Sequence, residues 1–400
     1  MKQRYDFLPL RKAWLLIVWG TLFLASCSRD NEPTVPQNQY MVESSVITEL
    51  SKDQVIQQVT ALSPVLSGFV RNGVKVYRLT YKTKNTDGTD ILATGALIIP
   101  VTTQPAAMIS VQHGTITSES QAPSNYGAGS EAATAGSLFG ALGYIIAYPD
   151  YIGYGASKEL PHPYEHRASL ASASLDMLRA AKEFLKNQNE VDWNEKLYLA
   201  GYSEGGYATL SLQKKIEEEA STEFNLRASS CGAGAYDKTA FIKYIINTPT
   251  SGVAGFNRSY LWVTLTYNQV YGLNRPASAF FKEPYATQIQ QSGINANIKV
   301  SFNTIFTNSF IKGINDGTDK GFLDAVADND VYDWKPRTPT QLYHGTADRL
   351  VFYFNSQNAF DAMTKRGAAS VALIPIQGGD HDTSLTDYLF GTLTFFTTNQ

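Results

Sequence analysis

Short apolar runs alternate with longer amphipathic segments over most of this 400-residue chain. The runs are aliphatic and of strand length, and they lie near residues 106–112, 143–148, 196–200, 226–233, 341–344 and 371–377. The segments between them have helical periodicity, most clearly over residues 164–186, where apolar side chains recur on one helix face. This alternation predicts an α/β protein whose mostly parallel sheet is covered by helices on both faces.

Two stretches depart from the alternation. Residues 74–83 and 91–100 flank the turn-forming sequence Asn-Thr-Asp-Gly-Thr, which predicts an antiparallel hairpin at the start of the sheet. Residues 236–335 separate two predicted core strands by more chain than a helix and its loops need, so we expect an inserted, largely helical cap there. Its aromatic side chains either line a substrate pocket or form the core of the cap. They are Phe241, Tyr244, Phe256, Tyr260, Trp262, Tyr267, Tyr271, Phe280, Phe281 and Tyr285.

The strongest chemical signal is the pentapeptide Gly-Tyr-Ser-Glu-Gly at residues 201–205. It follows the apolar run 196–200 directly and precedes a helical pattern, which is the strand–turn–helix context of a nucleophile elbow. Glycine at both flanking positions lets strand and helix approach closely while a strained turn exposes the Ser203 hydroxyl. An ordinary strand-to-helix turn can also contain glycine and serine. Evidence from the rest of the chain is therefore needed to distinguish a nucleophile elbow from such a turn.

A serine hydroxyl becomes a good nucleophile only beside a base that is itself oriented by an acid. In hydrolases with a nucleophile elbow, the acid and then the histidine follow the serine in the chain. His381 is the one histidine after Asp348, which lies just beyond the predicted strand 341–344. We therefore predict that Asp348 orients His381 and that His381 accepts the proton of Ser203. Asp380 is the rival acid, but a direct neighbour of His381 is badly placed to reach the inner nitrogen of that ring.

Ester or amide hydrolysis also needs donors for the negative oxygen of the tetrahedral intermediate. The predicted strand 106–112 leads into His113, Gly114 and Thr115 at the sheet edge where the elbow also lies. The candidate oxyanion-hole donors are the backbone N–H of Glu204 and that of either Gly114 or Thr115. We expect His113 to support this loop structurally.

Together these motifs resemble the α/β-hydrolase superfamily, most closely its secretory lipase and esterase branch and the bacterial lipoprotein relatives of that branch. The resemblance covers roughly residues 70–400. Besides the elbow, it rests on His-Gly-Thr at 113–115, Tyr-Pro-Asp-Tyr-Ile-Gly-Tyr-Gly at 148–155, His-Pro-Tyr at 162–164 and His-Gly-Thr-Ala-Asp at 344–348. It implies an α/β-hydrolase fold and cleavage of carboxylic esters through an acyl-enzyme, with Ser203, Asp348 and His381 as the triad and no cofactor.

The motifs leave the substrate open. Lipases, short-chain esterases and the acetyl or feruloyl esterases of polysaccharide side chains differ in pocket shape and share these residues. A prolyl-oligopeptidase-type peptidase would share the triad and fold but would need an acidic subsite, which the predicted cap does not reveal. A surface binding protein on an inactive scaffold is the remaining alternative, and the presence of the whole catalytic set speaks against it.

Four side chains are candidate pocket residues. Asp150, Tyr151 and Tyr154 follow the predicted strand 143–148 at the edge where open α/β sheets bind ligands. Tyr202 precedes the serine directly. Asp150 could hold the active-site loops together while the tyrosines wall the pocket, and a purely structural role fits the sequence equally well.

The sequence His-Pro-Tyr-Glu-His at residues 162–166 matches a zinc-hydrolase pattern. Pro163 allows both histidines on one helix face only at a helix start. We therefore interpret this segment as the N-terminus of the helix 164–186, with Pro163 in its first turn, and expect no metal.

The N-terminus has the pattern of a bacterial lipoprotein signal. Four basic residues precede an uncharged apolar stretch that is too short to span a membrane comfortably. Leu-Ala-Ser-Cys at residues 24–27 resembles a lipobox, so we expect a signal peptide over 1–26, lipid on Cys27 and a tether over 27–45. The hydrolase core would then comprise 46–235 and 336–400. The resemblance also implies a cell-envelope location, and Ser28 favours the outer membrane.

Composition limits the partners. The chain is 43% hydrophobic and 17% charged with a net charge of −3, and removal of the basic N-terminus would make it more acidic. An acidic protein is not expected to bind nucleic acid or an anionic membrane surface. The expected partners are therefore the ester substrate that the hydrolase resemblance implies and the membrane, through the lipid on Cys27 that the lipobox resemblance implies. With Cys27 lipidated, Cys231 has no disulfide partner, and the small residues around it predict a buried strand.

Overall fold

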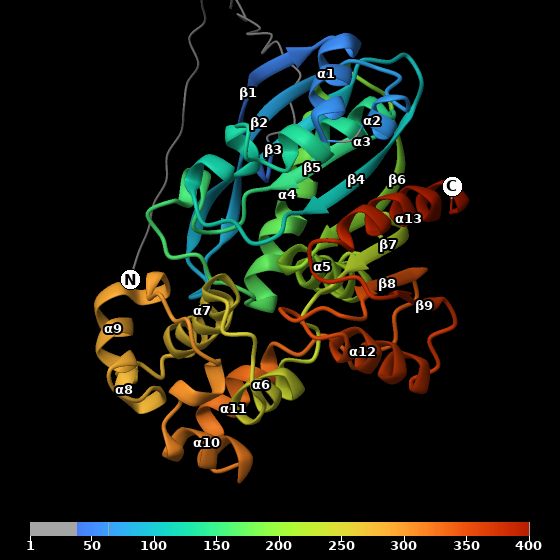
Figure 1. Cartoon of the computed structure of the whole chain (residues 1–400). Coiled ribbons are helices and arrows are strands. Elements are labelled where there is room, and N and C mark those ends of the chain that lie inside the picture. The colour runs from blue at the N-terminus through green and yellow to red at the C-terminus, as the bar shows by residue number, and fades with distance from the viewer. Residues whose placement is uncertain (1–37, 63, 400) are drawn as a thin grey trace, which may run out of the picture. The chain divides into compact units, whose positions relative to one another are not determined.

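Nine strands form one sheet in the computed structural model of the chain, which describes residues 38–62 and 64–399 (Figure 1). The strand order is β1-β2-β3-β5-β4-β6-β7-β8-β9. β1, β2, β3 and β5 pair in antiparallel fashion, and the strands from β5 to β9 are parallel. The bounds are β1 (Met41–Leu50), β2 (Val74–Lys84), β3 (Asp90–Pro100), β4 (Ala106–Gln112), β5 (Ile145–Pro149), β6 (Trp193–Tyr202), β7 (Asn225–Gly232), β8 (Thr340–Gly345) and β9 (Val371–Ile376).

The helices lie between and after these strands. Those before β8 are α1 (Lys52–Leu62), α2 (Pro64–Ser67), α3 (Ser137–Ala141), α4 (Arg167–Asn187), α5 (Glu204–Glu219), α6 (Lys238–Asn247), α7 (Ala254–Val270), α8 (Ala277–Phe280), α9 (Tyr285–Ser292), α10 (Asn308–Asn315) and α11 (Lys320–Asp328). After β8 follow α12 (Phe354–Lys365) and α13 (Leu385–Thr398).

Alternate residues of the central strands pack against opposite layers of helices. On β6, Leu197 and Leu199 face a core that includes α4 and α5, whereas Tyr198 and Ala200 face a core that includes α1, α3 and the C-terminal Phe396. Since side chains alternate along a strand, two apolar layers require a sheet covered on both sides. The predicted α/β-hydrolase fold class is confirmed.

Helices α6 to α11 all follow β7 and precede β8, within the range 236–335 predicted as a cap. Figure 1 shows them, in yellow to orange, gathered at one end of the described part of the chain. They have an apolar core of their own, in which Phe281 stacks on Phe306 with ring centroids 5.4 Å apart. Many of the predicted aromatic side chains, including Phe280 and Phe281, belong to this core, and three members of it, Phe241, Tyr260 and Tyr267, also line a cavity.

The strand order brings two chain segments together at the centre of the sheet. β4 pairs with β6 in parallel, with Gln112 opposite Gly201, so the loops that leave both strands begin side by side. β5 lies on the other side of β4, which makes the C-terminal end of β4 the point where the strand order reverses. Ligands bind at such a switch point in open α/β sheets.

The predicted strands agree with the observed ones within a few residues, but β1 was not predicted. It pairs with β2 from Met41 onward, so residues 41–45 belong to the sheet and not to the expected tether. The predicted start of the long helix was also wrong. α4 begins at Arg167 with His166 at its N-cap, which leaves Pro163 in the preceding loop.

Some predictions concern the ends of the chain or its cysteines. The expected signal peptide and Cys27 lie outside the described residues. Within residues 38–62 and 64–399, no helix combines the length and apolar character of a membrane span. Cys231 is buried on β7, and burial raises the pKa of its thiol to about 12.

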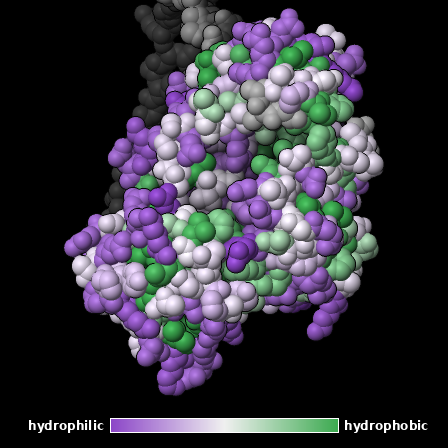
Figure 2. Space-filling model, viewed as in Figure 1, coloured by the Kyte–Doolittle hydropathy of each residue, from purple (hydrophilic) through white to green (hydrophobic). Residues whose placement is uncertain are grey.

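Figure 2 shows hydrophobic residues scattered among hydrophilic ones over the face that it presents.

Candidate active site

Ser203 occupies a strained turn between β6 and α5. Its φ of 60° and ψ of −124° lie in a region that residues with a side chain rarely adopt. Its N–H donates to the carbonyl oxygen of Gly232 on β7 (2.9 Å), which fixes the turn against the neighbouring strand. This is the geometry that the Gly-Tyr-Ser-Glu-Gly motif predicted.

The flanking glycines are required by close packing of the backbone. A Cβ at Gly201 would clash with the carbonyl oxygen of Gly205, and a Cβ at Gly205 would clash with the carbonyl oxygen of Gln112 at the end of β4. Strand, turn and helix can therefore pack this closely only without side chains at these two positions.

Three residues that are far apart in sequence form a continuous hydrogen-bonded line. The Ser203 Oγ lies 2.9 Å from the Nε2 of His381, and the Nδ1 of His381 lies 2.6 Å from the Oδ2 of Asp348. Because Nδ1 faces a carboxylate, it carries the ring proton, which leaves Nε2 as the acceptor for the serine hydroxyl. The arrangement can transfer the serine proton to the imidazole and stabilise the imidazolium that results.

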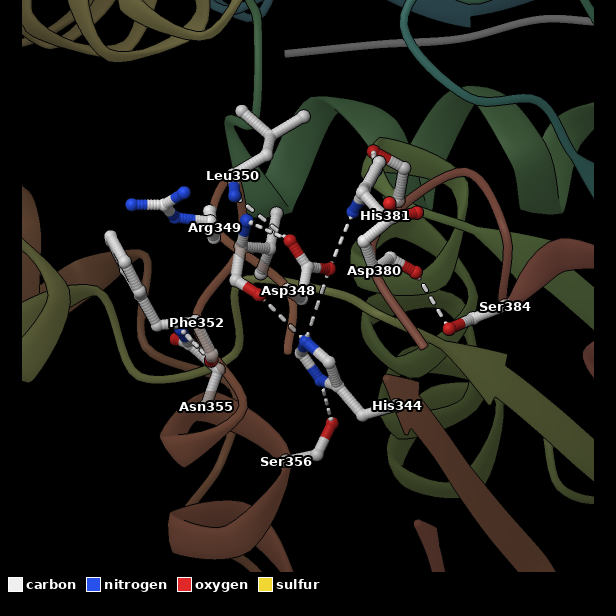
Figure 3. A network of polar contacts seen from close by, with 12 residues as sticks. His344, Asp348, Arg349, Leu350, Phe352, Asn355, Ser356, Asp380, His381 and Ser384 are labelled. Carbon is white, nitrogen blue, oxygen red and sulfur yellow. Dashed lines mark hydrogen bonds and ion pairs between the residues drawn. The ribbon is translucent and has the colours of Figure 1, made fainter. Parts of the chain in front are cut away.

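Asp348 is held by more than His381. Its Oδ1 accepts the N–H groups of Leu350 (2.9 Å) and Val351 (3.0 Å), and the Nε2 of His344 lies 3.4 Å from its Oδ2 (Figure 3). Burial alone would raise the pKa of this carboxyl group. The contacts from His344 and His381 outweigh burial and lower its pKa to about 2. Asp348 is therefore ionised at neutral pH.

His344 helps to hold Asp348 in place, a role that was not predicted from the sequence. Its Nε2 also lies 2.7 Å from the carbonyl oxygen of Val351, and its Nδ1 lies 2.7 Å from the hydroxyl of Ser356. Since Nε2 faces a carbonyl and a carboxylate, the network assigns the proton to Nε2 and makes Nδ1 the acceptor. The position of His344 four residues before Asp348 was visible in the sequence, but its ring orientation was not.

Asp380 does not act as the partner of His381. Its Oδ1 accepts hydrogen bonds from the Thr383 N–H (2.8 Å), the Thr383 hydroxyl (2.8 Å) and the Asp382 N–H (3.1 Å). The carboxylate is thus used to close the turn that carries His381, and Asp348 takes the place predicted for the acid.

The three candidate oxyanion donors differ in availability. A Cβ placed on Gly114 would lie 3.9 Å from the Cβ of Ser203, so the loop after β4 lies against the elbow. The Gly114 N–H, however, donates to the Oε1 of Glu131 (3.1 Å). The N–H groups of Thr115 and Glu204 have no acceptor within residues 38–62 and 64–399. The donors of Thr115 and Glu204 are therefore free of partners among the described residues, whereas the donor of Gly114 is already used.

The four tentative pocket residues do not line the cavity at Ser203. Asp150 is fully buried, and it accepts hydrogen bonds from the Thr94 hydroxyl (2.6 Å) and the Ser124 N–H (2.7 Å). Tyr151 and Tyr154 donate to carbonyl oxygens of the loop after β4. Of the two roles that the sequence left open, the structural one therefore fits these residues, because their polar groups hold loops together.

His113 has the supporting role that was expected. Its Nε2 lies 3.1 Å from the carbonyl oxygen of Asp150, and its ring packs on Tyr151 with centroids 4.0 Å apart. Tyr202, the fourth tentative pocket residue, instead donates its hydroxyl to the carbonyl oxygen of His381 (2.8 Å).

The residues of the zinc-like pattern have other partners. The Nε2 of His162 lies 2.8 Å from the Oε1 of Glu204, the residue after the serine, and its Nδ1 lies 2.7 Å from the carbonyl oxygen of Ile152. The Nδ1 of His166 lies 3.0 Å from the Ser169 hydroxyl, and burial lowers the pKa of this histidine to about 4. No group of side chains that could hold a metal ion occurs in the described ranges.

A cavity opens beside Ser203 between the sheet edge and the helices that follow β7. It contains about 590 Å³ of space outside protein atoms, including its open end, but the centre of a water molecule can occupy only about 40 Å³ of it. The cavity is therefore narrow. Its wall is mostly apolar and comprises Tyr164, Glu165, Lys238, Phe241, Ile242, Ile245, Ser259, Tyr260, Val263, Thr264, Tyr267, Phe322, Val326, Leu350 and Val351.

Comparison with known proteins identifies the family. A model described as secretory lipase matches residues 137–391, which is more than half of the chain and includes Ser203, Asp348 and His381. The chain belongs to the secretory lipase family and is an enzyme that hydrolyses esters. No curated protein sequence matches it significantly.

Solved structures share the fold. A protein of Legionella pneumophila is 24% identical with a TM-score of 0.77, and the match covers 90% of this chain and 98% of that one. The rice cell wall degrading esterase LipA of Xanthomonas oryzae, in a ligand-bound form, is 22% identical with a TM-score of 0.75, over 91% and 100% of the two chains. Candida antarctica lipase A in its closed state is 16% identical with a TM-score of 0.65, over 90% and 81%.

Proposed function

We propose that this enzyme is a serine esterase in which Ser203 forms an acyl-enzyme. The observation that carries the proposal is the hydrogen-bonded line from Asp348 through His381 to Ser203, with separations of 2.6 Å and 2.9 Å. Ser203 attacks the ester carbonyl while His381 accepts its proton and Asp348 holds the required tautomer. His381 then protonates the leaving alcohol, and water repeats the sequence on the acyl-enzyme.

The tetrahedral intermediate needs donors near Ser203. The N–H of Glu204 supplies one, and Thr115 supplies the other, because the N–H of Gly114 is already bonded to Glu131. The hydroxyl of Thr115 lies 2.8 Å from that of Tyr164, which holds the donor loop against the cavity.

The narrow, mostly apolar cavity receives the acyl group. Because little of this cavity is wide enough for a water-sized group, we expect it to accept short and medium chains more readily than long ones. The Xanthomonas oryzae neighbour is a cell wall degrading esterase, so esters linked to polysaccharides belong in the substrate panel alongside simple alkyl esters.

The test of this proposal is hydrolysis of p-nitrophenyl esters from acetate to palmitate by residues 28–400 and by the Ser203→Ala variant. We expect activity on short and medium chains, and a loss of several orders of magnitude in the variant with an unchanged melting temperature. Activity like that of the wild type in folded Ser203→Ala would remove Ser203 from its role.

We further propose that the chain is a lipoprotein of the bacterial cell envelope, anchored through Cys27 and located at the outer membrane. The proposal is supported by the lipobox-like sequence before Cys27 and the basic, apolar segment that precedes it. Metabolic labelling with a fatty acid should mark the full chain and should fail to mark Cys27→Ser. Equal labelling of both would exclude lipid attachment at this residue.

A further inference from the structure

Two oppositely charged side chains form part of the wall of the cavity at Ser203. Glu165 lies in the loop before α4, and Lys238 is the first residue of α6. The Lys238 ammonium donates a hydrogen bond to the Oε2 of Glu165. The side chains of Lys238 and Glu165 are only 3% and 7% exposed. An ion pair is therefore embedded in a wall that is otherwise mostly apolar.

The pair retains unused hydrogen-bonding capacity. An ammonium group has three N–H donors; one is used by Glu165, and the Nζ also lies 4.2 Å from the centroid of the Tyr207 ring. Only Lys238 donates to the carboxylate of Glu165 among the residues of the described ranges, and it does so at Oε2. Since Glu165 lines the cavity, a polar group bound there can donate to its other oxygen.

Stability alone is a poor explanation of this pair. Burial raises the pKa of Glu165 and lowers that of Lys238, which shows that the site opposes both charges. Apolar side chains of similar volume usually stabilise a buried position as well as an ion pair does. Glu165 also has a φ of 51°, a left-handed conformation that is unfavourable for a residue with a side chain. The chain therefore maintains a charged pair here against the cost of burial, and it does so at a strained backbone position.

We propose that the Glu165–Lys238 pair is a specificity site for a neutral hydroxyl or amide group of the substrate, an inference that rests on the proposed role of Ser203. A hydroxyl can donate to Glu165 and accept from Lys238 at the same time. A substrate carboxylate would compete with Glu165 for Lys238, and a substrate ammonium would compete with Lys238 for Glu165, so either one would leave a charge of the buried pair without its partner. The pair therefore selects polar, uncharged acyl or alcohol groups over plain alkyl chains and over charged ones.

The test compares substrates of equal length. The probes are p-nitrophenyl 3-hydroxybutanoate and 6-hydroxyhexanoate, each paired with the unsubstituted butanoate or hexanoate, and the monoester of adipic acid as the charged analogue. In the wild-type enzyme we expect kcat/KM for at least one hydroxylated ester to exceed that of its partner by roughly tenfold, the typical effect of a hydrogen bond to a charged group. The charged analogue should be the poorest substrate.

The decisive variant is the double substitution Glu165→Leu with Lys238→Met, which removes both charges and leaves no unpaired one in the wall. It should lose the preference for the hydroxylated ester and gain activity on the plain hexanoate. Ile245→Val, a change in the apolar wall, is the matched control. It should alter kcat/KM on the hydroxylated ester and on the plain ester by the same factor. A melting curve of each variant shows that it is folded.

The outcomes separate this inference from the proposed mechanism. The deciding quantity is the ratio of kcat/KM for a hydroxylated ester to kcat/KM for its plain partner. If the wild type prefers plain chains, or if this ratio is the same in the wild type and the folded double variant, the pair has no role in specificity and only joins the loop before α4 to α6. If the double variant does not fold, the ratios of the wild-type enzyme alone decide the question. Persistent activity in Ser203→Ala would instead refute the mechanism and leave the ratio test intact.

Discussion

The Tyr202 hydroxyl donates a hydrogen bond of 2.8 Å to the backbone carbonyl oxygen of His381, and the two rings lie 5.4 Å apart. The residue before the nucleophile thus fixes the loop that carries the base. Because β6 ends at Tyr202 and the His381 loop follows β9, this contact joins two strands that are not neighbours in the sheet.

Removal of this hydroxyl should loosen the base. We expect Tyr202→Phe to lower kcat about tenfold or less, with little change in KM, because proton transfer depends on the alignment of His381 with Ser203. Tyr198→Phe is the matched control, since its hydroxyl bonds to the carbonyl oxygen of Asn399 (3.1 Å) elsewhere on the same strand. Equal kinetics of the two variants would show that the Tyr202 contact does not position the base.

The ionisation of Asp348 should contribute to stability in a defined pH range. Its pKa in the folded protein is about 2, below the ordinary carboxyl value near 3.9. A lowered folded-state pKa stabilises the protein above the ordinary pKa, and this contribution is lost as the pH falls from about 4 to about 2. We expect the difference in unfolding free energy between wild type and Asp348→Asn to shrink by about 2 kcal/mol over that range. Urea unfolding at several pH values measures it, and a constant difference would contradict the assignment.

The close packing at the elbow predicts a sharp contrast between two glycines. Gly205→Ala places a Cβ against the carbonyl oxygens of Gln112 and His113, so we expect a loss of about 3 kcal/mol or more in stability. Gly255→Ala is the control, because a Cβ there meets no atom within 4 Å and α7 should gain about 0.5–1 kcal/mol. Similar melting temperatures for both variants would show that the elbow can relax.

The size of the cavity should set the acyl-chain preference. We expect Ile245→Ala to shift the best p-nitrophenyl ester toward longer chains, because it removes bulk from the narrow wall. Ile314 lies in the core of the helices after β7 but not in the cavity wall. The control variant Ile314→Val should therefore leave the chain-length profile unchanged. An unchanged profile in Ile245→Ala would mean that the acyl chain binds elsewhere.

Local motifs made much of the site predictable from the sequence. The elbow, the acid after β8 and the histidine after β9 each follow a predicted strand, and parallel strands bring them to one edge of the sheet. The strand β1 was missed because it is an edge strand with one partner, and its sequence Met-Val-Glu-Ser-Ser-Val-Ile-Thr-Glu-Leu lacks a regular apolar alternation.

Local motifs could not predict which residues form the cavity wall. Glu165 and Lys238 are 73 residues apart and lie in segments that only the fold brings together. Tyr151 and Tyr154 lie at the expected edge of the sheet, but the direction of their hydroxyl groups depends on carbonyl oxygens of the loop after β4. The contact between Gly114 and Glu131, which favours Thr115 as the proposed oxyanion donor, is likewise marked by no sequence pattern.

The most direct test of the central claim is to identify the residue that a fluorophosphonate probe modifies. The proposed mechanism predicts one adduct per active enzyme, located on Ser203 by mass spectrometry of the peptide, with loss of ester hydrolysis in proportion to labelling. Pre-incubation with a good ester substrate should slow the reaction. An adduct on another residue with full activity retained, or hydrolysis that persists in folded Ser203→Ala, would contradict the account.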